Sequence, residues 1–128
     1  MLDMDHFKMF NDRHGREAGD ALLKAVGKVL QESGRVEDVA CRYEGGEFTL
    51  LLPGATEQQT FDRAERIREA VVTLQVMHQE RVLEGNSISL GVATFPKHGR
   101  ELSALVSAAD RALYRAKHEG RNCVMHAE

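Results

Sequence analysis

Residues 42–48 read Arg-Tyr-Glu-Gly-Gly-Glu-Phe and separate two short runs of β-forming residues, 36–43 and 48–52. The paired glycines of this stretch accept the positive φ angles that a tight hairpin requires. The sequence therefore predicts two antiparallel strands joined around Gly45 and Gly46, near the middle of the chain.

Helical and β-type patterns alternate on both sides of this hairpin. A helical turn is predicted at residues 7–11, and longer amphipathic helices at 17–32, 57–76 and 102–118. Further strands are predicted at residues 87–95 and 122–126, the opening residues resemble the end of a strand, and 77–86 read as a connection. The order β-α-α-β-β-α-β-α-β favours an α/β fold of ferredoxin-like type, in which one mixed sheet is flanked by helices.

The composition is that of one compact domain. The chain has 128 residues, of which 42% are hydrophobic, and its formal net charge of -3 argues against binding to a nucleic acid polymer. No apolar run is long enough to cross a bilayer and no signal peptide is recognisable, so no membrane contact by this domain is expected. Cys41 and Cys123 each lie in an apolar run, which favours buried thiols and a cytoplasmic setting.

Polar residues at fixed spacing mark the first third of the chain. Asp3-Met4-Asp5 stands where a strand meets a helix, and carboxylates there can converge on a hard cation such as magnesium. Asn11 and Asp20 offer groups that can pair with a guanine edge, and Lys8 can meet a phosphate as a point charge. The alternative for all of these residues is a role as helix caps or solvated surface positions.

A third motif joins the first two. Towards the C-terminus the chain reads Ala109-Asp110-x-Ala112-Leu113-Tyr114-x-Ala116-Lys117-x-x-Gly120-Arg121-Asn122. With residues 3–20 and 42–48, this pattern resembles the GGDEF family in order and spacing, and residues 89–93 resemble the family's fourth strand. The resemblance covers residues 1–124 and implies a single GGDEF domain over 1–128, of nucleotide-cyclase-like fold, without the family's opening helix and the start of its first strand.

The resemblance implies a diguanylate cyclase, in which two GTP-loaded domains face each other as a homodimer in the full-length protein. It places Asp3 and the Met4 carbonyl against Mg²⁺, Asn11 and Asp20 on guanine, and four residues on the phosphates: Lys8, Gly45, Lys117 and Arg121. For Lys117 and Arg121 the alternatives are a cation at a helix C-terminus and a solvated loop cation.

The hairpin departs from the family pattern at two positions. Glu44 takes the place of the first glycine, and Gly46 takes the place of the third-position acid, which is a metal ligand in the family. Glu47 remains as the hairpin acid. Because phosphoryl transfer depends on positioning and charge stabilisation, we expect weakened magnesium binding and impaired cyclase activity. An active diguanylate cyclase is the alternative.

A second ligand site is predicted upstream of the hairpin. Arg35 and Asp38 have the spacing of the family's RxxD inhibitory motif, which binds cyclic di-GMP, and Arg66 takes the position of the accessory arginine. Arginine makes forked contacts with phosphate and stacks on bases; surface ion pairing is the alternative. The sequence thus favours a receptor module for cyclic di-GMP, with GTP as a further ligand, over a purely structural dimerisation module.

Overall fold

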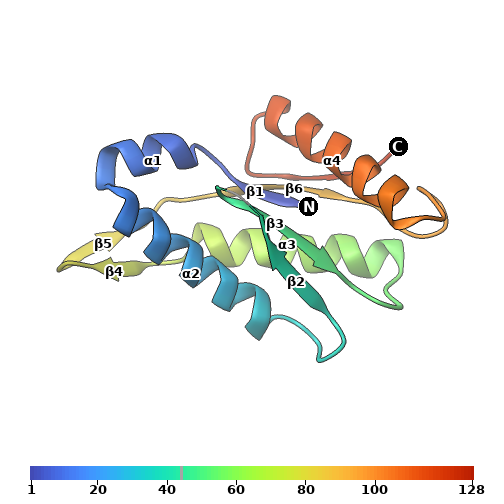
Figure 1. Ribbon diagram of the computed structural model, residues 1–128, viewed down its shortest axis with the longest axis horizontal. Coiled ribbons are helices and arrows are strands. Elements are labelled where there is room, and N and C mark those ends of the chain that lie inside the picture. Colours follow the sequence, from blue (N-terminus) through green and yellow to red (C-terminus); the bar gives the residue numbers. More distant parts are fainter. Residues whose placement is uncertain (44) are drawn as a thin grey trace.

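A computed structural model describes residues 1–43 and 45–128. Its main sheet has five strands in the order β2-β3-β1-β6-β7, all antiparallel except the β6–β7 pair. The strands of this sheet are β1 (Leu2–Met4), β2 (Val39–Arg42), β3 (Glu47–Leu51), β6 (Ile88–Val92) and β7 (Val124–His126). The helices are α1 (Phe7–His14), α2 (Arg16–Glu32), α3 (Glu57–Val72) and α4 (Leu102–His118). Helix α4 covers one face of the sheet, and α2 and α3 cover the other (Figure 1). This confirms the predicted mixed α/β fold.

Strand β6 lies between β1 and β7, and all five of its residues are buried. Helix α4 packs on it through a row of small residues: Ala108, Ala109, Ala112 and Ala116. A Cβ added to Gly91 would lie 2.2 Å from the carbonyl oxygen of Ala109. Only glycine therefore allows this approach of helix to strand, and the approach brings the C-terminal half of α4 toward β1.

On the opposite face, α2 presents Leu22, Val26 and Leu30, all essentially buried, to the sheet. Helix α3 adds Ile67 and Val71 to the same core. Its N-terminus is fixed by a capping box, in which Thr56 Oγ1 accepts from the Gln59 N–H and Gln59 Oε1 accepts from the Thr56 N–H.

The segment read as a connection contains a hairpin of its own. Strands β4 (Val76–His78) and β5 (Arg81–Leu83) pair in a separate two-stranded sheet that projects beyond the main sheet beside α2 (Figure 1). Its turn residues, Gln79 and Glu80, both have positive φ angles of 49° and 65°. Residues other than glycine and asparagine seldom occupy such a turn, so the usual sequence signal was missing.

The prediction for the cysteines is wrong in one case. Cys41 lies on the edge strand β2, where all four residues are exposed, and its thiol is free. Cys123 is half-buried. Its burial raises the pKa of the thiol, and the nearby Asp5 carboxylate raises it further. Apolar composition alone therefore did not distinguish an edge strand from a central one.

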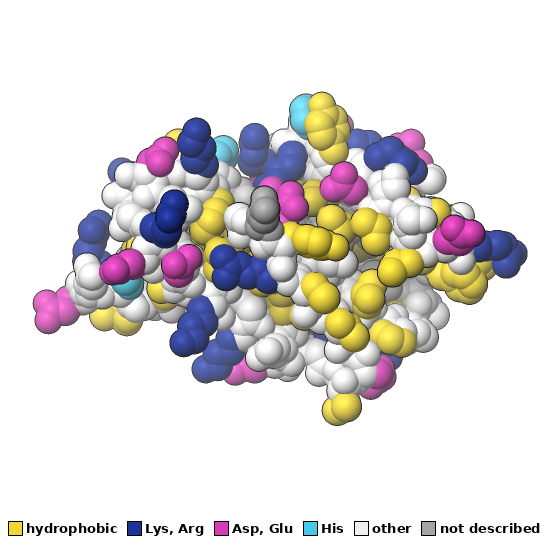
Figure 2. Space-filling view, viewed as in Figure 1, with side chains coloured by type: hydrophobic (Ala, Val, Ile, Leu, Met, Phe, Trp, Pro, Cys, Tyr) yellow, Lys and Arg dark blue, Asp and Glu magenta, His cyan; other side chains and the backbone are white. Residues whose placement is uncertain are grey.

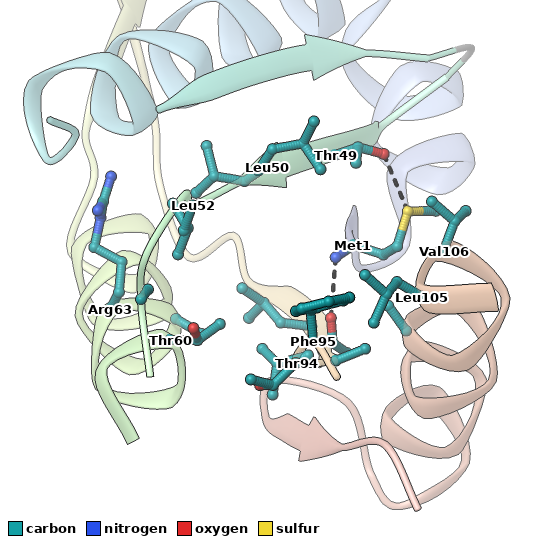
Figure 3. A pocket seen from close by; sticks show the side chains of 18 of the residues that line it. Met1, Thr49, Leu50, Leu52, Thr60, Arg63, Thr94, Phe95, Leu105 and Val106 are labelled. Atoms are coloured by element: carbon teal, nitrogen blue, oxygen red, sulfur yellow. Dashed lines mark hydrogen bonds between the residues drawn. The ribbon is translucent and has the colours of Figure 1, made fainter. Parts of the chain in front are cut away.

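A pocket of about 610 Å³ opens in the sheet beside β1. Residues of β1, β3 and β6 and of helices α3 and α4 line it. Figure 3 shows Leu50 and Leu52 on one side of the pocket and Leu105 and Val106 of α4 on another, and Figure 2 shows apolar side chains gathered on this part of the surface. None of the predicted nucleotide-binding residues lines it.

Over the described ranges, none of the helices has the length and apolar character needed to cross a membrane.

Candidate functional site

The carboxylate of Asp5 is the most heavily hydrogen-bonded side chain at the end of β1. Its Oδ1 accepts from Ser89 Oγ at 2.7 Å and from Lys117 Nζ at 2.8 Å. Its Oδ2 accepts from Ser87 Oγ at 2.7 Å and from the Asn122 backbone N–H at 3.0 Å. Burial opposes ionisation of Asp5, but Lys117 and the two serines outweigh it and hold the pKa of the carboxyl below its ordinary value. Asp5 is therefore an anion that binds other parts of the protein.

Lys117 reaches from the last turn of α4 across to β1. Beyond its contact with Asp5, its ammonium lies 3.3 Å and 3.1 Å from the carbonyl oxygens of Asp3 and Met4, and 3.4 Å from the Asp3 carboxylate. These are the residues predicted to face magnesium. The oxygens at the end of β1 thus form a cation-binding group, which the ammonium of the chain's own lysine contacts in this structure.

Glu47 is the hairpin acid that lies beside this group. In the β1–β3 ladder Asp3 is the direct partner of Glu47, and paired residues of antiparallel strands project from the same face of a sheet. Two carboxylates opposite each other repel unless a cation lies near, and Lys117 approaches Asp3 from α4. Within residues 1–43 and 45–128, no three or more His, Cys, Asp or Glu side chains are grouped to hold a metal ion.

Gly46 is packed more tightly than its place in a hairpin suggests. A Cβ added there would lie 2.8 Å from the Cβ of Met4 and 3.3 Å from Cγ of Phe7. The Met4 N–H also donates to the Gly46 carbonyl at 3.0 Å. The other substituted position, Glu44, lies outside the described residues.

The predicted guanine-binding residues come from consecutive helices. Asn11 on α1 presses its amide against α2, where a Cβ added to Gly19 would lie 1.8 Å from Asn11 Oδ1. Asp20, the next residue after Gly19, is exposed. The buried Asn11 Oδ1 has no hydrogen-bond donor among the residues described, which costs about 1–3 kcal/mol. A ligand that presents N–H groups would relieve this cost once the amide turns toward it.

The remaining predicted phosphate contacts lie on exposed backbone. Lys8 is exposed on α1, and Gly45 is exposed at the hairpin turn with a φ of 63°. Arg121 is exposed between α4 and β7, with a left-handed φ of 63°. Its N–H donates to the Ala116 carbonyl at 3.0 Å and closes the end of α4.

The RxxD motif forms a compact ion-pair cluster next to β2. Asp38 Oδ2 accepts from the Arg35 N–H at 2.8 Å, and Asp38 Oδ1 accepts from Arg35 Nη2 at 3.0 Å. Arg63 of α3 adds its Nη2 at 2.8 Å from Asp38 Oδ2. Burial disfavours the Asp38 anion, but the Arg35 N–H and the guanidinium groups of Arg63 and Arg35 outweigh this and lower the pKa of the carboxyl.

Arg66 was predicted for the cyclic di-GMP site, whereas the arginine of α3 that contacts Asp38 is Arg63, which was not predicted. Arg66 is exposed on α3, one helical turn after Arg63, so the two side chains start from neighbouring positions on the helix. The missed residue is the buried one. An arginine three residues before the predicted one, on the same side of an amphipathic helix, was the signal that could have indicated it. Asp5 was likewise treated only as one of two adjacent acids.

Comparison with known proteins identifies the family. The sequence profile of the family described as "Diguanylate cyclase, GGDEF domain" matches residues 1–123. The chain belongs to the GGDEF family. Diguanylate cyclase A of Treponema denticola is 36% identical to this GGDEF domain over 124 residues, 97% of this chain and 33% of that protein. Diguanylate cyclase DosC of Escherichia coli is 37% identical over 124 residues, 97% of this chain and 27% of that protein.

A solved structure agrees with this assignment. The GGDEF domain of DgcB from Caulobacter crescentus, crystallised in complex with c-di-GMP, is 31% identical and superposes with a TM-score of 0.89, covering 98% of this chain and 74% of that one. The GGDEF domain described here spans about a third or less of the length of the two curated relatives.

Proposed function

We propose that this GGDEF domain is a receptor module that binds cyclic di-GMP through Arg35 and Asp38, accepts GTP in a second site, and has impaired cyclase chemistry. The observation that carries the proposal is the Arg35–Asp38 arrangement, an arginine held by a carboxylate at the surface. A relative of the same fold was crystallised with c-di-GMP, which supports the choice of ligand.

The two ends of the Arg35 guanidinium have different partners. Nη2 donates to Asp38 and to the Pro53 carbonyl at 2.8 Å, so the arginine is anchored at this end. Nη1 lies 3.2 Å from Glu37, whose side chain is 53% exposed, and such a pair contributes about 0–1 kcal/mol. A phosphate of cyclic di-GMP can displace Glu37 at little cost, because Arg35 is already oriented by Asp38. Arg66, exposed one turn from Arg63, supplies a further cation.

In the second site we assign the guanine of GTP to Asn11 and Asp20 and its phosphates to Lys8, Lys117 and Arg121. The orphaned oxygen of Asn11 supports a ligand with N–H donors. The Asp3 carboxylate and the Met4 carbonyl would hold Mg²⁺, since oxygen donors suit this ion and already surround an ammonium here. When bound, the ion would neutralise phosphate charge.

The expected impairment of cyclase activity follows from the number of oxygen ligands that the chain offers to Mg²⁺. Gly46 offers no carboxylate, so Mg²⁺ lacks one ligand that the family supplies, and Glu44 adds a negative charge to the same hairpin. Loss of a metal ligand weakens the stabilisation of charge in phosphoryl transfer, which is most of what the protein contributes to that reaction.

The second candidate function is an active diguanylate cyclase. The placement of Glu47 directly opposite Asp3 favours it, because Glu47 provides a hairpin carboxylate next to the cation-binding oxygens. Both curated relatives described above are named as diguanylate cyclases. In either case we propose that the domain works in the cytoplasm as part of a longer, homodimeric protein.

Calorimetric titrations with cyclic di-GMP, GTP and a non-hydrolysable GTP analogue, each with and without Mg²⁺, test the proposal. We expect cyclic di-GMP to bind with or without Mg²⁺, and GTP to bind with an affinity that Mg²⁺ changes little. Absence of cyclic di-GMP binding would overturn the receptor function. Formation of cyclic di-GMP from GTP at a rate typical of the family would favour the second candidate.

A further inference from the structure

Asp5 connects three segments that are distant in sequence. Its carboxylate joins the end of β1 to Ser87 and Ser89 around β6, to Lys117 on α4, and to the backbone of Asn122 before β7. The side chain is 1% exposed, and each of its oxygens accepts two of these hydrogen bonds. A carboxylate has about four lone-pair positions, so Asp5 has no acceptor position left for a ligand.

Two of the four donors fix the cations of the phosphate site. The bond to Nζ holds the Lys117 ammonium at the end of β1. The bond to the Asn122 N–H holds the residue that follows Arg121, and both Arg121 and Asn122 have left-handed φ angles of 63° and 47°. Asparagine tolerates such an angle, but for arginine it is costly and persists where the surroundings impose it. The Asp5 contact thus pins the turn from which Arg121 projects.

We propose that Asp5 is a positioning residue that orients Lys117 and Arg121 together and thereby sets the affinity of the site for a polyphosphate. The proposal rests on the proposed binding of GTP. Asp5 itself touches neither phosphate nor metal. Because one buried carboxylate aligns both cations, each cation loses less conformational entropy when it binds a phosphate chain. The arrangement therefore favours a triphosphate over shorter anions.

The substitution Asp5→Asn isolates this role. An amide has one oxygen that accepts and one nitrogen that donates. The serine hydroxyl groups can rotate to donate to the oxygen or to accept from the nitrogen. Lys117 Nζ and the Asn122 N–H only donate, and they contact different oxygens of Asp5. The amide therefore satisfies one of them and leaves the other facing a donor. Asp110→Asn, at an exposed position of α4, makes the same charge change away from the site and serves as the matched control.

The test uses two half-ligands and the whole ligand, titrated by NMR in EDTA so that no divalent cation contributes. Inorganic tripolyphosphate reports on the cations, guanosine on Asn11 and Asp20, and GTP on both. Asp5→Asn should weaken tripolyphosphate and GTP by roughly tenfold, the effect of one charge-assisted hydrogen bond, and leave guanosine within about twofold. Asp110→Asn should match the wild type for all three.

Equal weakening of guanosine and tripolyphosphate would mean that Asp5 merely stabilises the fold, and it would overturn the proposal. So would unchanged tripolyphosphate binding, or a wild-type protein that binds neither tripolyphosphate nor GTP. The last result would also remove GTP from the proposed function, while the cyclic di-GMP titration would still decide the receptor role. If Asp5→Asn does not fold, Ser87→Ala is tested in its place. This variant must bind tripolyphosphate and GTP about threefold more weakly and bind guanosine as the wild type does.

Discussion

Arg63 Nη2 lies 2.8 Å from Asp38 Oδ2, and the two side chains are only 7% and 5% exposed. This pair connects helix α3 to the segment before β2, and Asp38 in turn holds Arg35. A buried ion pair of this kind is strongly destabilising when one partner is removed, because the other charge is left uncompensated.

Asp38→Asn should therefore lower the free energy of unfolding at pH 7 by about 3 kcal/mol. The pKa of Asp38 is below its ordinary value of 3.8 in the fold, so its contribution is fully present above about pH 4 and is lost as the pH falls through the lowered pKa. Urea unfolding of wild type and variant between pH 7 and pH 3 should show the difference shrinking below about pH 4. Glu37→Gln, at an exposed pair, should change stability by less than about 1 kcal/mol. A difference that is constant over the whole pH range would contradict this assignment.

The approach of α4 to β6 gives a second prediction. Gly91→Ala should destabilise the domain by about 3 kcal/mol, because its Cβ would overlap the backbone of α4. Gly27→Ala is the matched control: its Cβ would meet only Cε1 of Phe48 at 4.0 Å, so it should stabilise α2 by up to about 1 kcal/mol. Thermal unfolding of both variants checks the opposite signs. A Gly91→Ala variant as stable as the wild type would show that helix packing on Gly91 is looser than described.

Much of the fold was predictable because the apolar patterns of its long elements are regular. Helix α4 was predicted at its observed bounds, and the β2–β3 pairing follows from the glycine pair. The β4–β5 hairpin was not predicted, because the residue types of Gln79 and Glu80 do not indicate a turn with positive φ angles. Glutamine and glutamate are not among the residues that mark such turns in a sequence.

The candidate site was predictable only through motifs whose residues converge in space. Lys117 and Asp3 are far apart in the chain, and a family pattern, not periodicity, brought them into one prediction. The roles of Arg63 and Asp5 depend on burial and on which atoms they meet, neither of which a single sequence shows. The assignments to guanine, phosphate, magnesium and cyclic di-GMP stay predictions.

The hairpin gives a third prediction. With dimerisation supplied by a fused coiled coil, the unmodified domain should make little cyclic di-GMP from GTP and Mg²⁺, and any residual rate should fall at least about tenfold in Glu47→Gln. Glu44→Gly with Gly46→Asp should raise the rate at least about tenfold, although the Cβ at position 46 must displace Met4 and will cost about 1–3 kcal/mol of stability. Product formation is measured chromatographically. An unmodified domain as fast as the double variant would show that the lost carboxylate is not limiting.

Glu37 gives a fourth prediction, because its carboxylate lies 3.2 Å from Arg35 Nη1, the end of the guanidinium to which we assign a phosphate of cyclic di-GMP. Glu37→Gln removes a carboxylate that both occupies the guanidinium and repels phosphate, so cyclic di-GMP should bind about threefold more tightly. The gain should shrink as salt is raised, since the pair is exposed. Calorimetry at two salt concentrations checks both effects, and weaker binding by the variant would place Glu37 among the ligand's own contacts.

Calorimetric titration of cyclic di-GMP into the wild type and Arg35→Ala tests the central claim most directly, with Arg100→Ala, an exposed arginine outside the cluster, as the control. We predict that the wild type and Arg100→Ala bind with equal affinity and that Arg35→Ala binds at least about tenfold more weakly, because it loses the forked contact with phosphate. Equal affinity of all three proteins, or no binding by the wild type, would contradict the assignment of this domain as a receptor that reads cyclic di-GMP through Arg35.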